Sequence, residues 1–196
     1  MFLQTSYLEW AANILTALCI YLAGRNKVLT WPVGIIATCL FGVLFYKAGL
    51  FADSLLQVFF IATGIIGWMG WKNNKIVEEI PTHIDVKKFV LYSVIAIIVA
   101  IAYGYFLLYR VADTFDAYVP FVDSLILTLS ILGQLLLMRK KIETWMVWIV
   151  VNIISVPLYF SRDLYLTSFM YSLFLINAVV SYFYWKKLMG EKNVAV

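Results

Sequence analysis

Apolar residues occur in seven long runs that are separated by short polar segments. The runs cover residues 7–24, 30–46, 52–71, 89–109, 121–138, 144–160 and 165–185. Each run has about 17–21 residues, close to the roughly 20 that a helix needs to cross a hydrocarbon layer ~30 Å thick. The runs are continuously apolar, whereas the strands of a membrane barrel alternate. The pattern predicts an all-α integral membrane protein with seven transmembrane helices.

Charged residues are sparse and unevenly placed. They make up 13% of the chain, against 64% hydrophobic residues, which is far from the composition of a soluble domain. With the N-terminus outside, twelve Lys and Arg residues fall in inner segments and three in outer ones. The positive-inside rule therefore predicts an N-out, C-in protein. This bias accounts for the net charge of +4, so no nucleic-acid partner is expected.

Residues 25–72 and 139–186 are related by an internal repeat. Adding 114 to a residue number in the first segment gives its partner in the second, as in Thr30 with Thr144 and Leu50 with Leu164. Further pairs are Arg25 with Arg139, Trp31 with Trp145, Trp71 with Trp185 and Lys72 with Lys186. In an apolar chain, such a repeat is typical of secondary transporters built from two related halves, with the substrate site between them.

Seven spans and a repeat of three helices fit one arrangement. A unit of three helices begins and ends on opposite faces of the membrane, so one extra helix is needed to make two such units parallel. This 3+1+3 plan predicts a first repeat at 1–72 and a second repeat at 119–187. Between them, residues 73–118 form a cytoplasmic loop, a linker helix at about 89–109 and an outer loop. Residues 188–196 are predicted to be a cytoplasmic tail.

Polar and aromatic residues within the spans recur at helical spacing. In the sixth span, one face carries Trp145, Trp148, Asn152, Ser155 and Tyr159. Thr38 takes the place of Asn152 in the first repeat. One face of the third span carries Gln57, Gly64, Gly67, Trp68 and Trp71, and the matching face of the seventh span begins with Tyr171. Inside a bilayer such side chains usually face the bundle interior or a cavity.

Depth along the helices supports a small-molecule site. At 1.5 Å per residue, Asn152 lies ~12 Å from the inner end of its helix and Gln57 ~8 Å from the outer end of its own. Aromatic faces at this depth could stack on a flat ring or a cation. Alternatives remain open: Gln57 and Asn152 could bond neighbouring helices, Trp31 and Trp145 are equally interpretable as interface anchors, and Trp10, Trp71 and Trp185 are interpreted as anchors.

Two motifs resemble the nicotinamide riboside transporter family of the PnuC type. The first is Leu50-Phe51-Ala52-Asp53-Ser54-Leu55-Leu56-Gln57 followed by Gly67-Trp68-x-x-Trp71, and the second is Arg139-Lys140-x-x-Glu143-x-Trp145-x-x-Trp148-x-x-x-Asn152. The resemblance covers residues 4–187. It implies a fold of seven helices like a full-length version of the sugar-transporting SWEET proteins. It also implies vitamin uptake by facilitated diffusion across the bacterial cytoplasmic membrane, with trapping by a cytoplasmic kinase, and a homotrimer.

By this resemblance, Gln57, Trp148 and Asn152 contact the substrate, and Trp145 and Tyr171 lie near it. Thr38, Tyr159 and Trp68 complete the candidate set on the spacing described above. Gly64 stands where many family members carry an asparagine, so thiamine, which is also a flat cation, and riboflavin remain alternatives to nicotinamide riboside. No cofactor and no metal are expected.

Other classes of membrane protein fit less well. The only histidine, His83, lies in a loop, and no carboxylate pair or Ser/His arrangement lies within a span, so an enzyme is not expected. A seven-helix receptor, the remote alternative, has no reason for a 3+1+3 duplication. No Asp, Glu, Lys or His lies in the middle third of a repeat helix, which favours a uniporter over a proton-coupled pump.

Overall fold

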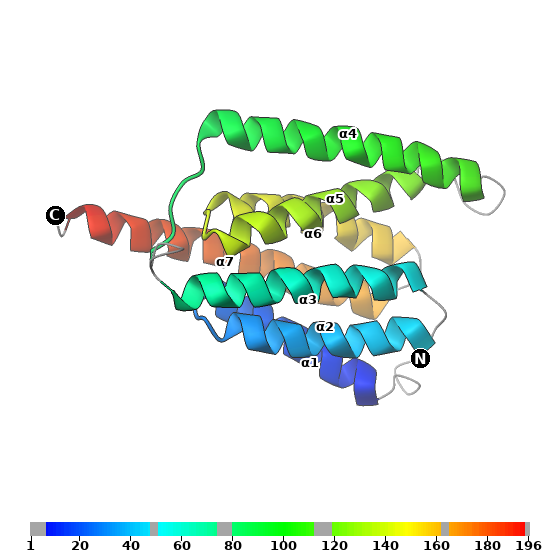
Figure 1. Ribbon diagram of the computed structural model, residues 1–196, viewed down its shortest axis with the longest axis horizontal. Coiled ribbons are helices and arrows are strands. Elements are labelled where there is room, and N and C mark those ends of the chain that lie inside the picture. Colours follow the sequence, from blue (N-terminus) through cyan, green and yellow to red (C-terminus); the bar gives the residue numbers. More distant parts are fainter. Residues whose placement is uncertain (1–6, 48–50, 74–79, 112–118, 162–164, 195–196) are drawn as a thin grey trace. The chain divides into compact units, whose positions relative to one another are not determined.

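The computed structural model describes residues 7–47, 51–73, 80–111, 119–161 and 165–194, and within them it has seven α-helices (Figure 1). Leu50 and Leu164, a matched pair of the predicted repeat, lie outside these residues. The helices are α1 (Tyr7–Gly24), α2 (Thr30–Lys47), α3 (Phe51–Lys72), α4 (Val86–Val111), α5 (Val119–Met138), α6 (Glu143–Ser161) and α7 (Tyr165–Val194).

Each of the seven apolar runs coincides with a helix. Five of these helices contain a segment long and apolar enough to cross a membrane: α1, α4, α5, α6 and α7. In α2 the apolar segment Thr30–Leu44 is shorter. The prediction of an all-α membrane fold is therefore confirmed at the level of seven helices and five clear candidate spans.

Two helix boundaries differ from the apolar pattern. Helix α4 begins at Val86, three residues before its run, because Asp85 caps it: the Lys88 backbone N–H donates to Asp85 Oδ1 at 3.1 Å. Helix α7 continues to Val194, so residues 188–194 of the predicted tail are helical. The side chains of Lys187 and Glu191, one turn apart, approach to 3.8 Å on this charged extension.

The chain forms two compact units. The first comprises residues 1–80 and 184–196, and the second comprises residues 81–183. Within the first unit α1 packs against α2 and α2 against α3; within the second, α4 packs against α5 and α5 against α6.

The core of the second unit lies where α4, α5 and α6 meet. Its buried apolar side chains are Ala96, Leu132, Leu136, Val147 and Val151. The predicted linker helix α4 approaches α5 closely, because a Cβ added at Gly104 would clash with the ring of Phe121. Small residues on α4 thus let two helix backbones come together, as is common in membrane bundles.

The turn between α1 and α2 and the turn between α5 and α6 have matching backbones. Residues 24–31, here the first turn, contain Asn26 at φ 53°, and residues 138–145, the second turn, contain Lys140 at φ 48°. The Asn26 and Lys140 N–H groups donate to carbonyls three residues earlier, both at 2.9 Å. The next N–H groups, of Lys27 and Lys141, donate five residues back, both at 3.0 Å. This pair of bonds is characteristic of a helix ended by a left-handed residue.

A threonine hydroxyl closes each turn. Thr30 Oγ1 donates to the carbonyl of Cys19 at 2.9 Å, and Thr144 Oγ1 donates to the carbonyl of Gly133 at 2.8 Å. Both bonds span eleven residues and tie the start of one helix to the body of the preceding one. Both threonines are buried.

Candidate functional site

Helix α6 supplies four of the eight predicted site residues. On its predicted face, Trp145, Asn152 and Ser155 are 2%, 3% and 0% exposed, whereas Met146, Val150 and Ile153 on the other side are about half exposed. The apolar exposed side suits lipid, and the buried side carries an indole, an amide and a hydroxyl. The interpretation of Trp145 as an interface anchor is therefore wrong, since its ring is enclosed.

Trp148 is held against α5 by the absence of a side chain at Gly133. A Cβ at that position would lie 3.0 Å from Cε2 and 3.1 Å from Nε1 of the Trp148 indole. The ring is half-buried and also packs against the core cluster of Val147, Val151 and their neighbours. Gly133 was not among the predicted residues, because its contact with Trp148 depends on how α5 and α6 pack and has no local signal in the sequence.

Tyr159 and Tyr171 meet near the end of α6. Their ring centroids are 5.0 Å apart at an interplanar angle of 47°, and Phe174 lies 5.6 Å beyond Tyr171. Helix α7 is tied to α6 nearby, because Ser168 Oγ donates to the carbonyl of Val156 at 2.9 Å. The structure thus brings together two of the predicted residues from different helices.

In the first unit, Thr38 and Gln57 lie on neighbouring helices. Thr38 Oγ1 donates to the carbonyl of Gly34 on its own helix at 2.8 Å. One turn further along α2, a Cβ at Gly42 would lie 3.5 Å from Cβ of Gln57, so the glycine lets α3 bring Gln57 close to α2. Trp68 is 40% exposed on α3, beside the exposed side chains of Ile65 and Met69, and is not drawn into this group.

A cluster of three tryptophans forms in the first unit. The rings of Trp31 and Trp71 meet edge to face at 5.4 Å, and the ring of Trp185 lies 6.2 Å from that of Trp71. Trp185 Nε1 donates to the carbonyl of Gly24 at 3.1 Å. Trp71 and Trp185 are 2% and 0% exposed, so their interpretation as interface anchors is wrong. Trp10, at 42% exposure, remains compatible with that role.

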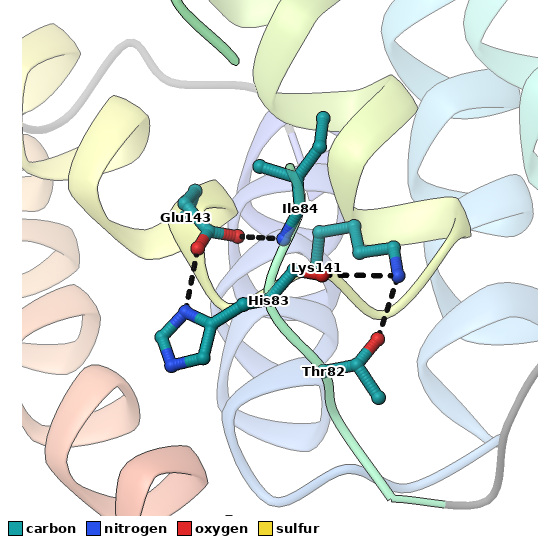
Figure 2. Close-up of polar contacts among 5 residues, drawn as sticks. All are labelled: Thr82, His83, Ile84, Lys141 and Glu143. Atoms are coloured by element: carbon teal, nitrogen blue, oxygen red, sulfur yellow. Dashed lines mark hydrogen bonds and ion pairs between the residues drawn. The ribbon is translucent and has the colours of Figure 1, made fainter. Parts of the chain in front are cut away.

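The segment before α4 docks on the second turn (Figure 2). His83 Nδ1 lies 2.7 Å from Oε1 of Glu143, and the Ile84 N–H donates to Oε2 at 3.1 Å. A carboxylate only accepts hydrogen bonds, so His83 Nδ1 carries the proton. Lys141 Nζ donates to Thr82 Oγ1 at 2.6 Å and to the His83 carbonyl at 3.3 Å. Backbone bonds from Thr82 to Lys140 and from Ile142 to Thr82, both 3.0 Å, complete the junction.

Metal chemistry finds no support in the described residues. Among them, no group of three or more His, Cys, Asp or Glu side chains is placed to hold a metal ion. The His83–Glu143 pair is engaged with the backbone of the junction and is structural.

Comparison with known proteins places the chain in a family. The family model described as nicotinamide mononucleotide transporter matches residues 6–187. The nicotinamide riboside transporter PnuC of Escherichia coli (strain K12) is 31% identical over 190 residues, covering 85% of this chain and 79% of that protein. The chain therefore belongs to this family of multi-pass membrane transporters, which confirms the PnuC-type resemblance.

Two further comparisons concern the fold and the substrate. A crystal structure of the vitamin B3 transporter PnuC superposes with a TM-score of 0.71 at 23% identity, covering 97% of this chain and 85% of that one, and so shows the fold. The riboflavin/roseoflavin transporter RibM of Streptomyces davaonensis is 26% identical over 171 residues, covering 85% of this chain and 78% of that protein.

Proposed function

We propose that this protein carries nicotinamide riboside across the bacterial cytoplasmic membrane by facilitated diffusion. The match to the family over residues 6–187, which includes the whole α6 face, carries the proposal. A cytoplasmic kinase then traps the vitamin, because an added phosphate makes it a poor ligand for an interior without cations. The protein is a carrier and not an enzyme.

The riboside is favoured over the mononucleotide on electrostatic grounds. In the seven helices, every Lys and Arg lies in a terminal turn or in the extension of α7 after Trp185. A phosphate moved into the apolar bundle needs a cationic partner there, and the chain supplies none. The nicotinamide ring of the riboside is itself a flat cation, which aromatic faces such as that of Trp148 attract.

The site is proposed to include Trp145, Trp148, Asn152, Tyr159 and Tyr171 in the second unit. In the first unit it includes Gln57, Thr38 and Trp68. The burial of Asn152 and the close contact of the Trp148 indole with Gly133 support the first group, and the Gly42–Gln57 approach supports the second. Asn152 can both donate to and accept from a carboxamide or a sugar hydroxyl.

All seven helices are proposed to span the membrane in a 3+1+3 parallel repeat, N-out and C-in. The matching bonds of the first and second turns, 114 residues apart, support the repeat. The tight packing of α4 on α5 suits a linker helix, and the excess of cations in the inner segments supports the orientation. A homotrimer is proposed from the family resemblance and is testable by the mass of the purified complex.

Uniport is the proposed mechanism, since the middle third of each repeat helix has no Asp, Glu, Lys or His to carry a proton or bind a coupling ion. Uptake into proteoliposomes is expected to follow the vitamin gradient alone. A steep dependence of the uptake rate on an imposed proton gradient would contradict uniport.

Calorimetry of the purified protein with nicotinamide riboside, thiamine and riboflavin tests the substrate. Nicotinamide riboside is expected to bind at micromolar strength and to lose binding in Asn152→Ala. The matched control is Asn177→Ala, an amide of α7 off the predicted face, which should keep wild-type affinity. Binding of riboflavin alone would assign the protein the function that RibM's name states. Binding of none of the three would overturn the proposed function and leave the family fold.

A further inference from the structure

Ser155 differs from several other hydroxyl-bearing residues of the helices because its hydroxyl is enclosed and unpaired. Its side chain is 0% exposed, and its Oγ has no hydrogen-bond partner among the described residues. By contrast, Thr16, Thr38, Ser124, Ser130 and Ser172 each donate to the carbonyl four residues earlier on their own helix. A serine within a helix ordinarily makes that bond, so an enclosed serine without it has an unmet hydrogen-bonding capacity.

The unpaired hydroxyl has an energetic consequence. A buried polar group without a partner costs about 1–3 kcal/mol relative to a paired one. The repeat does not require a hydroxyl at this place, because the matching residue of the first repeat is Phe41. Packing alone therefore gives no reason for serine over alanine at position 155.

The position of Ser155 identifies what could pair with it. Ser155 lies one turn after Asn152 and one turn before Tyr159 on the buried face of α6. It is seven residues from Trp148, which corresponds to about 10 Å along the helix axis. A nucleoside whose flat ring stacks on the Trp148 indole can reach Ser155 with its sugar when it lies along this face of α6.

We propose that the Ser155 hydroxyl binds a sugar hydroxyl of the transported nucleoside and makes the site selective for a ribose-bearing substrate. The inference rests on the proposed function and deepens it. A ribose hydroxyl both donates and accepts, so it satisfies a serine that makes neither bond among the described residues. The enclosed state of the hydroxyl is consistent with a carrier that opens its site in only part of its cycle.

The test compares Ser155→Ala with wild type by calorimetry, using nicotinamide riboside and its 2′,3′-dideoxy analogue. Loss of one hydrogen bond is expected to weaken nicotinamide riboside about 10-fold in Ser155→Ala. The dideoxy analogue should bind the variant and wild type equally. Equal affinity of both proteins for nicotinamide riboside, or an equal loss for both ligands, overturns the proposal.

Ser124→Ala is the matched control, since Ser124 is also 0% exposed but its Oγ donates to the Pro120 carbonyl at 2.6 Å. The control should have a lower melting temperature and unchanged affinity, whereas Ser155→Ala should melt at or above the wild-type temperature because no bond is lost. Failure of wild-type protein to bind nicotinamide riboside is a distinct result, which overturns the proposed function itself.

Discussion

The first turn joins α1 to α2 and the second joins α5 to α6, and their hydrogen bonds match at an offset of 114 residues. A left-handed residue ends the leading helix, and a threonine hydroxyl ties the next helix back over eleven residues. The side chains between these fixed points differ. Where α1 packs on α2, beyond the first turn, Cys19 fills the space beside Gly34. Where α5 packs on α6, beyond the second turn, the Trp148 indole fills the space beside Gly133.

Large and small residues have thus changed places across the same helix contact. Residue 19 corresponds to 133 and residue 34 to 148, so cysteine and glycine in one copy become glycine and tryptophan in the other. The exchange keeps one side chain and one gap at each contact, which conserves packing. The larger side chain thus lies on the first helix of the pair in one copy, as Cys19, and on the second helix in the other, where the Trp148 indole joins the face of Asn152.

The two turns also hold different segments of the chain. Trp185 donates to the Gly24 carbonyl at the first turn, and the guanidinium of Arg25 lies 5.3 Å from the ring centroids of both Tyr21 and Tyr184. The second turn instead binds residues 82–84 through Lys141 and Glu143. The same backbone turn therefore binds the aromatic end of α7 in the first unit and the extended polar segment 82–84 in the second.

Removing the carboxylate of the second turn should have the largest effect. Glu143→Ala leaves the half-buried Ile84 N–H and the His83 ring without their acceptor, and we expect a loss of about 2 kcal/mol of stability. The measurement is the thermal melting of the purified protein in detergent. Leu29→Ala, at the matching position of the first turn and 63% exposed, is the control and should change little. Equal losses in the two variants would contradict a special role for the junction.

Alanine substitutions at Gly133 and Gly34 should distinguish an effect on stability from an effect on substrate affinity. In Gly133→Ala the new Cβ meets the Trp148 indole at 3.0 Å, so the ring must shift by a few tenths of an ångström. We expect about 1 kcal/mol of lost stability and a several-fold loss of affinity for nicotinamide riboside, measured by calorimetry. Gly34→Ala meets Cys19 Sγ at 2.8 Å and should lower stability without changing affinity. Unchanged affinity in Gly133→Ala would remove Trp148 from the site.

Deleting the two closing hydroxyls should have equal effects. Thr30→Val and Thr144→Val keep the side-chain shape and lose the hydroxyl's bond to the preceding helix, which should cost about 1 kcal/mol in each case. Thr30→Val also loses a 3.4 Å contact with Cys19 Sγ, but a thiol is a weak hydrogen-bonding partner. Melting temperatures of the two variants measure the costs. A difference larger than about 1 kcal/mol would show that the two turns are not energetically equivalent, despite their matching geometry.

The smallest expected effect is at the left-handed residue of the first turn. Asn26→Ala replaces a residue that tolerates positive φ by one that does not, at a cost of about 0.5–1 kcal/mol. The melting temperature in detergent should fall slightly. Gly190→Ala, where an added Cβ meets nothing within 4 Å, provides a control of unchanged or slightly higher stability.

The spans were predictable because hydrocarbon requires long apolar helices. The apolar pattern predicted the ends of most helices to within a few residues. The exceptions are the start of α4, which Asp85 caps, and the end of α7, which polar residues extend along 186–194. The burial of Trp71 and Trp185 was not predictable from position alone. Tryptophan near a helix end normally indicates the membrane interface, and only contact between distant segments shows that these two rings are enclosed.

Part of the candidate site followed from spacing, and part did not. Helical periodicity placed Trp145, Asn152 and Ser155 on one buried face of α6, and the structure confirms that burial. The pairing of Glu143 with His83 joins residues 60 apart and has no local signal. The gap at Gly133 became visible only once its neighbouring helix was in place. Whether the predicted side chains contact substrate stays a prediction.

The bond between Trp185 and Gly24 spans 161 residues of chain, and this separation orders events during synthesis. At about 5–20 residues per second, a ribosome needs roughly 10–30 s to make the intervening chain. The hydrogen bond from Trp185 to the Gly24 carbonyl therefore cannot form until α7 has been synthesised. Residues 82–84 have already been synthesised when Lys141 and Glu143 of the second turn are added to the chain. The contacts of the first turn therefore form with a segment synthesised long after it, whereas those of the second turn form with a segment synthesised before it.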